Sequence, residues 1–131
     1  MDLSRSFDDP DEIVEVGGTR EEIVTIGGLT VSRNTTPPGW RWSEHVKPLI
    51  GGEWCTAHHV GVVLSGHMAV ELADDTSTVV GPGELYDIPP QHDGHSVGDE
   101  PVVAIEWSGA GAWAGGSLRH RVVRTLLFTD V

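Results

Sequence analysis

Residues 55–66, CTAHHVGVVLSG, combine one thiol and two adjacent histidines with an aliphatic run that leads to a glycine. Thiolate and imidazole are side-chain groups that bind zinc, iron, nickel and copper in proteins. Neighbouring side chains on a β-strand point to opposite faces of the sheet, so His58 and His59 cannot both face the interior. The segment therefore predicts one inward-facing histidine with access to a metal or a ligand.

Two more histidines, His92 and His95, lie close together after a segment that contains several prolines. Histidines from adjacent strands can both reach one ion at Zn–N distances of about 2.0–2.1 Å, so His59 and His92 are the favoured pair. The alternative is that each of them hydrogen-bonds to a neighbour in a polar pocket. His95 and His45 are reserve ligands, although an exposed loop position would also explain His45.

Cys55 is the single cysteine of the chain, so it has no disulfide partner within it. On a regular strand Cys55 and His59 would lie about 13 Å apart, which is too far for both to bind one ion. A β-bulge would shorten that path. We treat Cys55 as a metal-ligand candidate, with a small buried apolar residue as the alternative interpretation.

The segment PGWRWSEHVKP places Trp40 and Trp42 on one face of an expected strand and Arg41 on the other. The two indoles either fill the core or line the entrance of a pocket for a flat or apolar ligand. In the second case Arg33 and Arg41 would supply positive charge suited to a carboxylate on the ligand. Tyr86 is the fourth candidate pocket residue, beside Arg33, Trp40 and Trp42.

Other catalytic patterns do not occur in the sequence: it has no G-x-S-x-G elbow, phosphate-binding glycine loop or C-x-x-C pair. If the chain is an enzyme, metal-assisted chemistry is the route that its residues allow.

The elements that must position these residues are short strands. β-branched runs alternate with turn residues throughout, and the chain holds 17 glycines and 8 prolines, which indicates an all-β sandwich or barrel. No stretch from 13 to 108 keeps a helical period. We expect tight turns at Ser65-Gly66, Asp74-Asp75 and 81–83. Closure into a barrel would hide the strand edges.

The length and the charge of the chain limit its domain organisation and the classes of partner that it can have. A chain of 131 residues suits one domain, which we divide into a flexible acidic N-terminus (1–12), a barrel (13–108) and a Gly/Ala-rich linker with a tail (109–131). The net charge of −12 argues against nucleic acid as a partner. Without a signal peptide or a long apolar run, we expect no membrane association and a cytoplasmic location. The exposed edges of small barrels favour a homodimer.

Two spans resemble the paired motifs of the cupin family. The first is Gly52-(5)-His58 with Gly66, and the second is GPGELYDIPPQH, residues 81–92. The usual cupin motifs are G-x5-H-x-H-x3,4-E-x6-G and G-x5-P-x-G-x2-H-x3-N. PGWRWSEHVKP and VGDEPV resemble a bacterial subgroup of small cupins. The resemblance implies a jelly-roll β-barrel whose wide mouth holds a pocket and often a divalent metal.

The chain departs from these motifs at the positions of the metal ligands. The glutamate of the first motif falls on His59, and the second-motif histidine falls on Gly94 or His92. In this register His59 points into the barrel and His58 points outward. The implied metals are zinc, iron, manganese, nickel or copper, and the candidate ligands are His59, His92, His95, His45, Glu53 and Cys55.

The C-terminal residues 124–131, RTLLFTDV, resemble the opening strand of class III nucleotide cyclase domains, with Asp130 at the first metal-binding aspartate. This likeness implies a cyclase-type effector domain as a partner. Together these observations favour a small-molecule-binding cupin module, with or without a metal, in a sensing or regulatory role. The alternative is a metal-dependent cupin enzyme, such as an oxygenase, isomerase or lyase, that acts on a small organic substrate.

Overall fold

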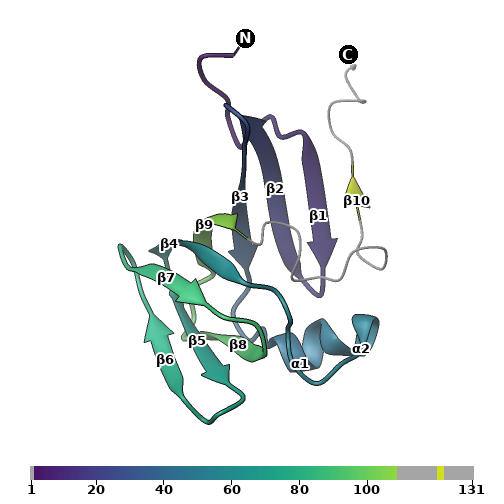
Figure 1. Ribbon diagram of the computed structural model, residues 1–131, viewed down its shortest axis with the longest axis vertical. Helices are drawn as coiled ribbons and strands as arrows, with labels where there is room; N and C mark the ends of the chain where they lie inside the picture. Colours follow the sequence, from purple (N-terminus) through teal and green to yellow (C-terminus); the bar gives the residue numbers. More distant parts are fainter. Residues whose placement is uncertain (1, 109–120, 123–131) are drawn as a thin grey trace.

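The computed structural model describes residues 2–108 and 121–122 (Figure 1). These residues form antiparallel β-structure, as the all-β prediction required. The strands are β1 (Glu12–Val16), β2 (Thr19–Ile26), β3 (Leu29–Thr36), β4 (His59–Ser65), β5 (His67–Leu72), β6 (Ser77–Val80), β7 (Leu85–Ile88), β8 (His92–Val97), β9 (Val102–Ser108) and β10 (Arg121–Val122).

The strands form two sheets. One sheet has seven strands in the order β10-β1-β2-β3-β9-β4-β7, and the other has three in the order β6-β5-β8. Consecutive strands such as β4 and β5 therefore lie in different sheets, which is how a jelly roll encloses its interior. In Figure 1 the strands β4 to β8 gather at one end of the fold, below β1, β2 and β3.

Glycine and aspartate residues form the turns that the sequence predicted. Gly66 connects β4 to β5 with a φ of 77°, a conformation that favours glycine. A Cβ atom at Gly66 would also collide with the backbone of Pro101. Asp75, with a φ of 72°, and Gly83, with a φ of 81°, lie in the other two predicted turns. These three turns are confirmed.

The segment 42–50 differs from the expectation of a strand that carries Trp40 and Trp42. It forms two single-turn helices, α1 (Trp42–His45) and α2 (Lys47–Ile50). Each is too short to produce a helical period in the sequence, which is why the pattern did not reveal them. The end of α1 packs against the β1–β2 turn, since a Cβ atom at Gly17 would meet the backbone of His45.

The interior between the sheets holds two apolar clusters. One is centred on Val14, Trp42 and Val46, which are at most 2% exposed, and includes Cys55. The other contains Val63, Val80 and Val102. Truncation of a fully buried large side chain in such a core costs about 3–5 kcal/mol. The clusters form the rigid surroundings of the site described below.

The residues before β1 contact the first sheet. Arg5 pairs with Asp11 at 2.7 Å, Asp8 pairs with Arg33 at 2.9 Å, and Pro10 is fully buried.

The division into an N-terminal segment, a barrel and a tail stays a prediction. Most of the tail, including Asp130, lies outside the described residues. None of the helices in the described part of the chain has the length and apolarity needed to cross a membrane.

Candidate metal and ligand site

The interior contains a cavity of about 110 Å³. Strands from both sheets supply its walls: β2, β3, β4, β7 and β9 from the larger sheet, and β5, β6 and β8 from the smaller one. The surface of the wall is largely apolar, and one group of its polar side chains contains a thiol, two imidazoles, a phenol and a carboxylate. A cavity with an apolar wall and a few convergent polar groups is the usual form of a small-molecule site.

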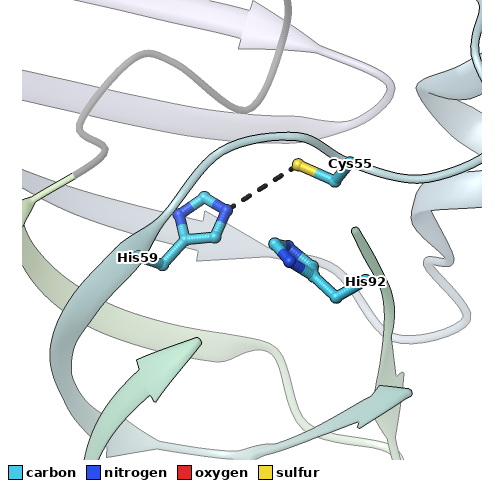
Figure 2. Close-up of side chains that lie close together, drawn as sticks. All are labelled: Cys55, His59 and His92. Atoms are coloured by element: carbon cyan, nitrogen blue, oxygen red, sulfur yellow. Dashed lines mark hydrogen bonds between the residues drawn. The ribbon is translucent and has the colours of Figure 1, made fainter. Parts of the chain in front are cut away.

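Cys55, His59 and His92 form the centre of that polar group. Each offers one potential ligand atom, and the three atoms lie within 4.8 Å of one another. Figure 2 shows the sulfur of Cys55 and the two imidazole rings facing one another. The Cys55 Sγ atom lies 3.8 Å from Nε2 of His59, and the two ring centroids are 5.0 Å apart. All three residues are less than 9% exposed.

The position of Cys55 corrects the expectation of a 13 Å separation from His59. That estimate assumed a regular strand through both residues, whereas β4 begins only at His59. Cys55 instead pairs with His92 at the start of β8: its backbone N–H donates to the His92 carbonyl at 2.8 Å, and its carbonyl accepts from the His92 N–H at 3.2 Å. This bridge places Cys55 beside both histidines.

His59 faces the interior and His58 faces outward, as the motif register predicted. His59 is 8% exposed and lines the cavity. His58 is exposed and pairs with Asp87 at 2.6 Å on the surface. The burial of Cys55, Ala57, His59, Gly61 and Val63 alternates with more exposed neighbours, so one face of this segment looks into the barrel.

Both buried histidines are oriented through Nδ1. The Nδ1 atom of His59 lies 2.9 Å from Oε2 of Glu106, and that of His92 lies 2.7 Å from the carbonyl oxygen of Pro89. Since a carbonyl oxygen can only accept, Nδ1 of His92 is the donor in this hydrogen bond. A carboxylate or carbonyl partner on the other ring nitrogen is the usual arrangement of a metal-binding histidine.

Glu106 is the site residue that the sequence reasoning missed. It lies on β9, and on this strand Val102, Ala104 and Glu106 are buried in alternation with more exposed residues. Its Oε1 atom accepts a hydrogen bond from the Tyr86 hydroxyl at 2.9 Å. The signal that could have identified it in the sequence is a single acidic residue on the apolar face of a strand in which buried and exposed positions alternate.

Gly61 makes the contact between Tyr86 and Glu106 sterically feasible. On β4, Gly61 is paired with Tyr86 on one side and with Glu106 on the other. A Cβ atom at Gly61 would lie 2.6 Å from the Tyr86 hydroxyl oxygen and would also collide with the carbonyl of Ile105. The missing side chain therefore lets Tyr86 reach across β4 to the carboxylate.

The close packing of these groups changes their pKa values. Burial opposes ionisation of Cys55, but hydrogen bonds from His59 and His92 outweigh it and lower the thiol pKa to about 6. Burial also opposes the imidazolium of His59, yet contacts with Cys55 and Glu106 raise its pKa to about 10. Burial and the Glu106 carboxylate raise the pKa of Tyr86, so it remains a neutral phenol. At neutral pH Cys55 and His59 thus form a thiolate–imidazolium pair, and an ion would have to displace the Nε2 proton of His59 in order to bind both residues.

The predicted pocket residues divide into two sets. Trp40, Trp42 and Tyr86 line the cavity. Arg33 does not line it: its guanidinium pairs with Asp8 and Glu22. Arg41 also lies outside the cavity wall and pairs with Glu71 and Asp93. The expected positive charge for a carboxylate ligand is therefore not in the lining.

The other metal-ligand candidates lie away from the three central donors. His45 is exposed, and its Nδ1 atom contacts the backbone of Arg41. Glu53 is exposed. His95 is half-buried, with Nδ1 3.9 Å from Glu71, and it does not line the cavity. Of the four residues considered as the third ligand, the structure brings Cys55 to His59 and His92.

Comparison with solved structures identifies the architecture. An RmlC-like cupin from Shewanella frigidimarina is 15% identical and matches with a TM-score of 0.55 over 86% of this chain and 95% of its own. A protein with a double-stranded β-helix domain from Klebsiella pneumoniae is 16% identical, with a TM-score of 0.52 over 95% of this chain and 98% of its own. This chain has the cupin fold. A protein of unknown function from Rhizobium leguminosarum is 19% identical, with a TM-score of 0.55 over 82% and 98% of the two chains.

No family model matches this sequence, and no curated protein matches it either. The structural neighbours just described are all less than 25% identical to this chain, so they establish its fold and leave its chemistry to the residues of the site.

The three central donors fit a transition-metal ion. One thiolate and two imidazoles suit zinc and copper, and also iron and nickel, whereas manganese prefers oxygen ligands. Glu106, the carboxylate in this group, is already engaged by His59 and Tyr86. Among the predicted metals, manganese is the one that this donor set fits least.

Proposed function

We propose that this cupin is a small-molecule-binding module whose cavity holds a transition-metal ion through Cys55, His59 and His92. The main support is the orientation of both imidazoles: each contacts an oxygen acceptor through Nδ1, so Nε2 is the nitrogen that could bind a metal once its proton is displaced. The buried thiol that lies beside them, with its lowered pKa, supplies a third donor. A sensing or regulatory role agrees with a ligand set that differs from the usual cupin motifs.

The chain's own residues prepare the site for an ion and a ligand. Glu106 accepts a hydrogen bond from Nδ1–H of His59 and thereby fixes the orientation of the ring. Tyr86 donates a hydrogen bond to the second carboxylate oxygen of Glu106. The backbone bridge between Cys55 and His92 fixes the remaining two donors. A bound ion would supply Lewis acidity toward an oxygen atom of the ligand.

Metal titration tests this proposal directly. Metal-free full-length protein is titrated with Co²⁺, and binding is followed by the thiolate-to-cobalt charge-transfer absorption. We expect one ion per chain, loss of the charge-transfer band in Cys55→Ser, and strongly weakened binding in His59→Asn and His92→Asn. His58→Asn is the matched control, because His58 is adjacent in sequence but exposed at the surface. Equal binding by the wild type and Cys55→Ser would overturn the assignment.

A metal-dependent enzyme is the second candidate, and a specific observation favours it. Three protein ligands that face a cavity are typical of catalytic rather than structural zinc sites. In addition, the half-buried Tyr86 donates its hydroxyl to the buried Glu106 carboxylate in the cavity wall, where the pair could hold or transfer a proton. Metal-loaded protein is incubated with small candidate substrates. Turnover that is lost in Tyr86→Phe, although this variant still binds the metal, would establish that the chain is an enzyme. Ligand binding without turnover would favour the binding module.

A further inference from the structure

The wall that the larger sheet gives the cavity changes from polar to apolar along its strands. On β4 the wall residues run from His59 to Val63, and on β9 they run from Glu106 to Val102. Each pair is four residues apart on one strand, which corresponds to about 13 Å. Val63 is paired with Ala104 in the antiparallel register, so the apolar ends of both strands lie at the same end of the cavity.

The smaller sheet changes from polar to apolar in the same direction. His92 is paired with Leu72 of β5, whereas Met68, four residues back along β5, is paired with Val80 of β6. His92, Met68 and Val80 all line the cavity. The polar ends of the two sheets coincide, because the ring centroids of His92 and His59 are 5.0 Å apart (Figure 2).

The apolar ends of the two sheets meet in one buried group. It contains three valines, Val63, Val80 and Val102, which we call the valine cluster, and Met68 packs against it. Thr36, the wall residue paired with Val102, accepts a hydrogen bond from the Thr19 hydroxyl at 3.2 Å. Each of these two hydroxyls thus has a partner within the protein, and the valine cluster determines the character of this end.

The volume of the cavity limits the width of a ligand. About 110 Å³ is less than the roughly 150 Å³ of a cavity that accommodates benzene, which has six carbon atoms. Residues from both ends line the cavity, so this volume extends over a length of about 13 Å. A small volume spread over such a length is narrow. A straight chain of carbon atoms fits this shape better than a ring or a branched group.

The two ends of the cavity suit the two ends of such a chain. The polar end offers imidazole and phenol groups, which form hydrogen bonds with oxygen atoms. An ion held by the three central donors would bind an oxygen atom at the same place. The valine cluster offers an apolar surface, where a hydrocarbon group gains free energy by leaving water.

We infer that the cavity takes a short, unbranched aliphatic chain of no more than about six carbon atoms that carries one oxygen-bearing head group. The head group lies at the three central donors, and the terminal methyl group lies in the valine cluster. This inference rests on the proposed function, since it names the ligand class of the same site. It narrows the flat or apolar ligand, which the two tryptophans predicted, to an aliphatic chain.

Two alcohols of the same formula test the shape. 1-Hexanol is straight, and 3,3-dimethyl-1-butanol carries the same head group on a branched body. Both are titrated into full-length protein, zinc-loaded and metal-free, and binding is followed by ligand-observed NMR. We expect 1-hexanol to bind at least about tenfold more tightly, because the branched body overpacks a narrow cavity. Equal affinities would overturn the inference.

A series of straight alcohols tests the length. From 1-propanol to 1-hexanol, each added methylene group should tighten binding by about fourfold, the value of burying one such group. 1-Decanol should bind no more tightly than 1-hexanol, because its chain exceeds the cavity. An affinity that rises steadily through 1-decanol would indicate an open apolar surface and would contradict the length limit.

A substitution in the valine cluster tests the position of the methyl group. Val80→Ala makes space at this end, so the affinity for 1-octanol relative to 1-hexanol should rise by about fourfold, the value of one further buried methylene. Val79→Ala is the matched control, because Val79 precedes Val80 on β6 but is 53% exposed. The same affinity ratio in both variants would place the chain elsewhere.

The orientation of the chain is measured with and without a metal, so the two proposals can fail separately. In metal-free protein, the terminal methyl of 1-hexanol should show nuclear Overhauser effects to the methyl groups of Val80 and Val102. In cobalt-loaded protein, the paramagnetic ion should relax the protons beside the hydroxyl faster than those of that methyl. If cobalt does not bind but the Overhauser effects are present, the metal site fails and the ligand class stands. If cobalt binds and 1-hexanol does not bind, or binds in the reverse orientation, the ligand class fails and the metal site stands.

Discussion

His59 and Glu106 form a buried contact of 2.9 Å between Nδ1 and Oε2 that joins β4 to β9. The carboxylate is 3% exposed and receives a second hydrogen bond from Tyr86. Because Nδ1 is engaged, the Nε2 atom of His59 is directed to Cys55. The contact therefore determines which nitrogen of His59 is available at the site, and Glu106 acts as a positioning residue.

Glu106→Gln should weaken metal binding by about 10–100-fold, the usual effect of losing a carboxylate partner behind a metal-binding histidine. The amide leaves the volume nearly unchanged and removes the charge that favours the Nδ1 proton. Competition against a chelator of known affinity measures the change. Glu71→Gln is the control, because Glu71 pairs with Arg41 outside the cavity. Equal affinities for the wild type and Glu106→Gln would show that the contact does not support the site.

Gly61→Ala should destabilise the fold by about 1–3 kcal/mol, the typical cost of overpacking. The added Cβ would overlap the Tyr86 hydroxyl and the Ile105 carbonyl, so β4 and β7 would have to separate. Denaturant unfolding measures the loss. Gly94→Ala is the matched control, since a Cβ there would meet its nearest atoms at 3.6 Å or more. If both variants unfold at the same denaturant concentration as the wild type, the close approach at Gly61 is not significant.

The lowered pKa of Asp11 leads us to predict that the fold loses stability in acid. A hydrogen bond from Arg5 holds the pKa of Asp11 below its ordinary value of 3.8, and the Thr25 amide assists. A group with a lowered folded-state pKa stabilises the fold above its unfolded value and loses that contribution as pH falls. Asp11→Asn should therefore flatten the acid side of the stability profile, by no more than about 1 kcal/mol for this partly exposed pair. Denaturant unfolding at a series of pH values measures the slope, and equal slopes in the wild type and Asp11→Asn would contradict this prediction.

Zinc should raise the thermal unfolding midpoint of the wild type. A ligand that binds only the folded chain adds about 2.7 kcal/mol at a free concentration one hundred times its dissociation constant. Cys55→Ala should abolish most of this shift, because it removes one of the three donors. His58→Ala should retain it. A shift of the same size in Cys55→Ala would indicate that zinc binds elsewhere.

The strand pattern and the motif register were sufficient to predict the turns and the inward orientation of His59. Alternation in LTVSRNTT also places Asn34 and Thr36 inside, which would have excluded Arg33 from the cavity wall. Cys55 could not be placed, because its distance from His59 depends on an irregular stretch that precedes β4. Glu106 was overlooked because the cupin motifs end before β9. The subgroup, the homodimer and the cyclase-like tail stay predictions.

The two histidines of the site belong to different sheets: His59 begins β4 of the seven-stranded sheet, and His92 begins β8 of the three-stranded one. A bound ion would therefore act as a crosslink across the barrel. Gain or loss of that crosslink would change how readily the two sheets separate, and the amide protons of β4 and β8 would exchange more slowly in the loaded protein. Binding of the metal would then make the barrel stiffer.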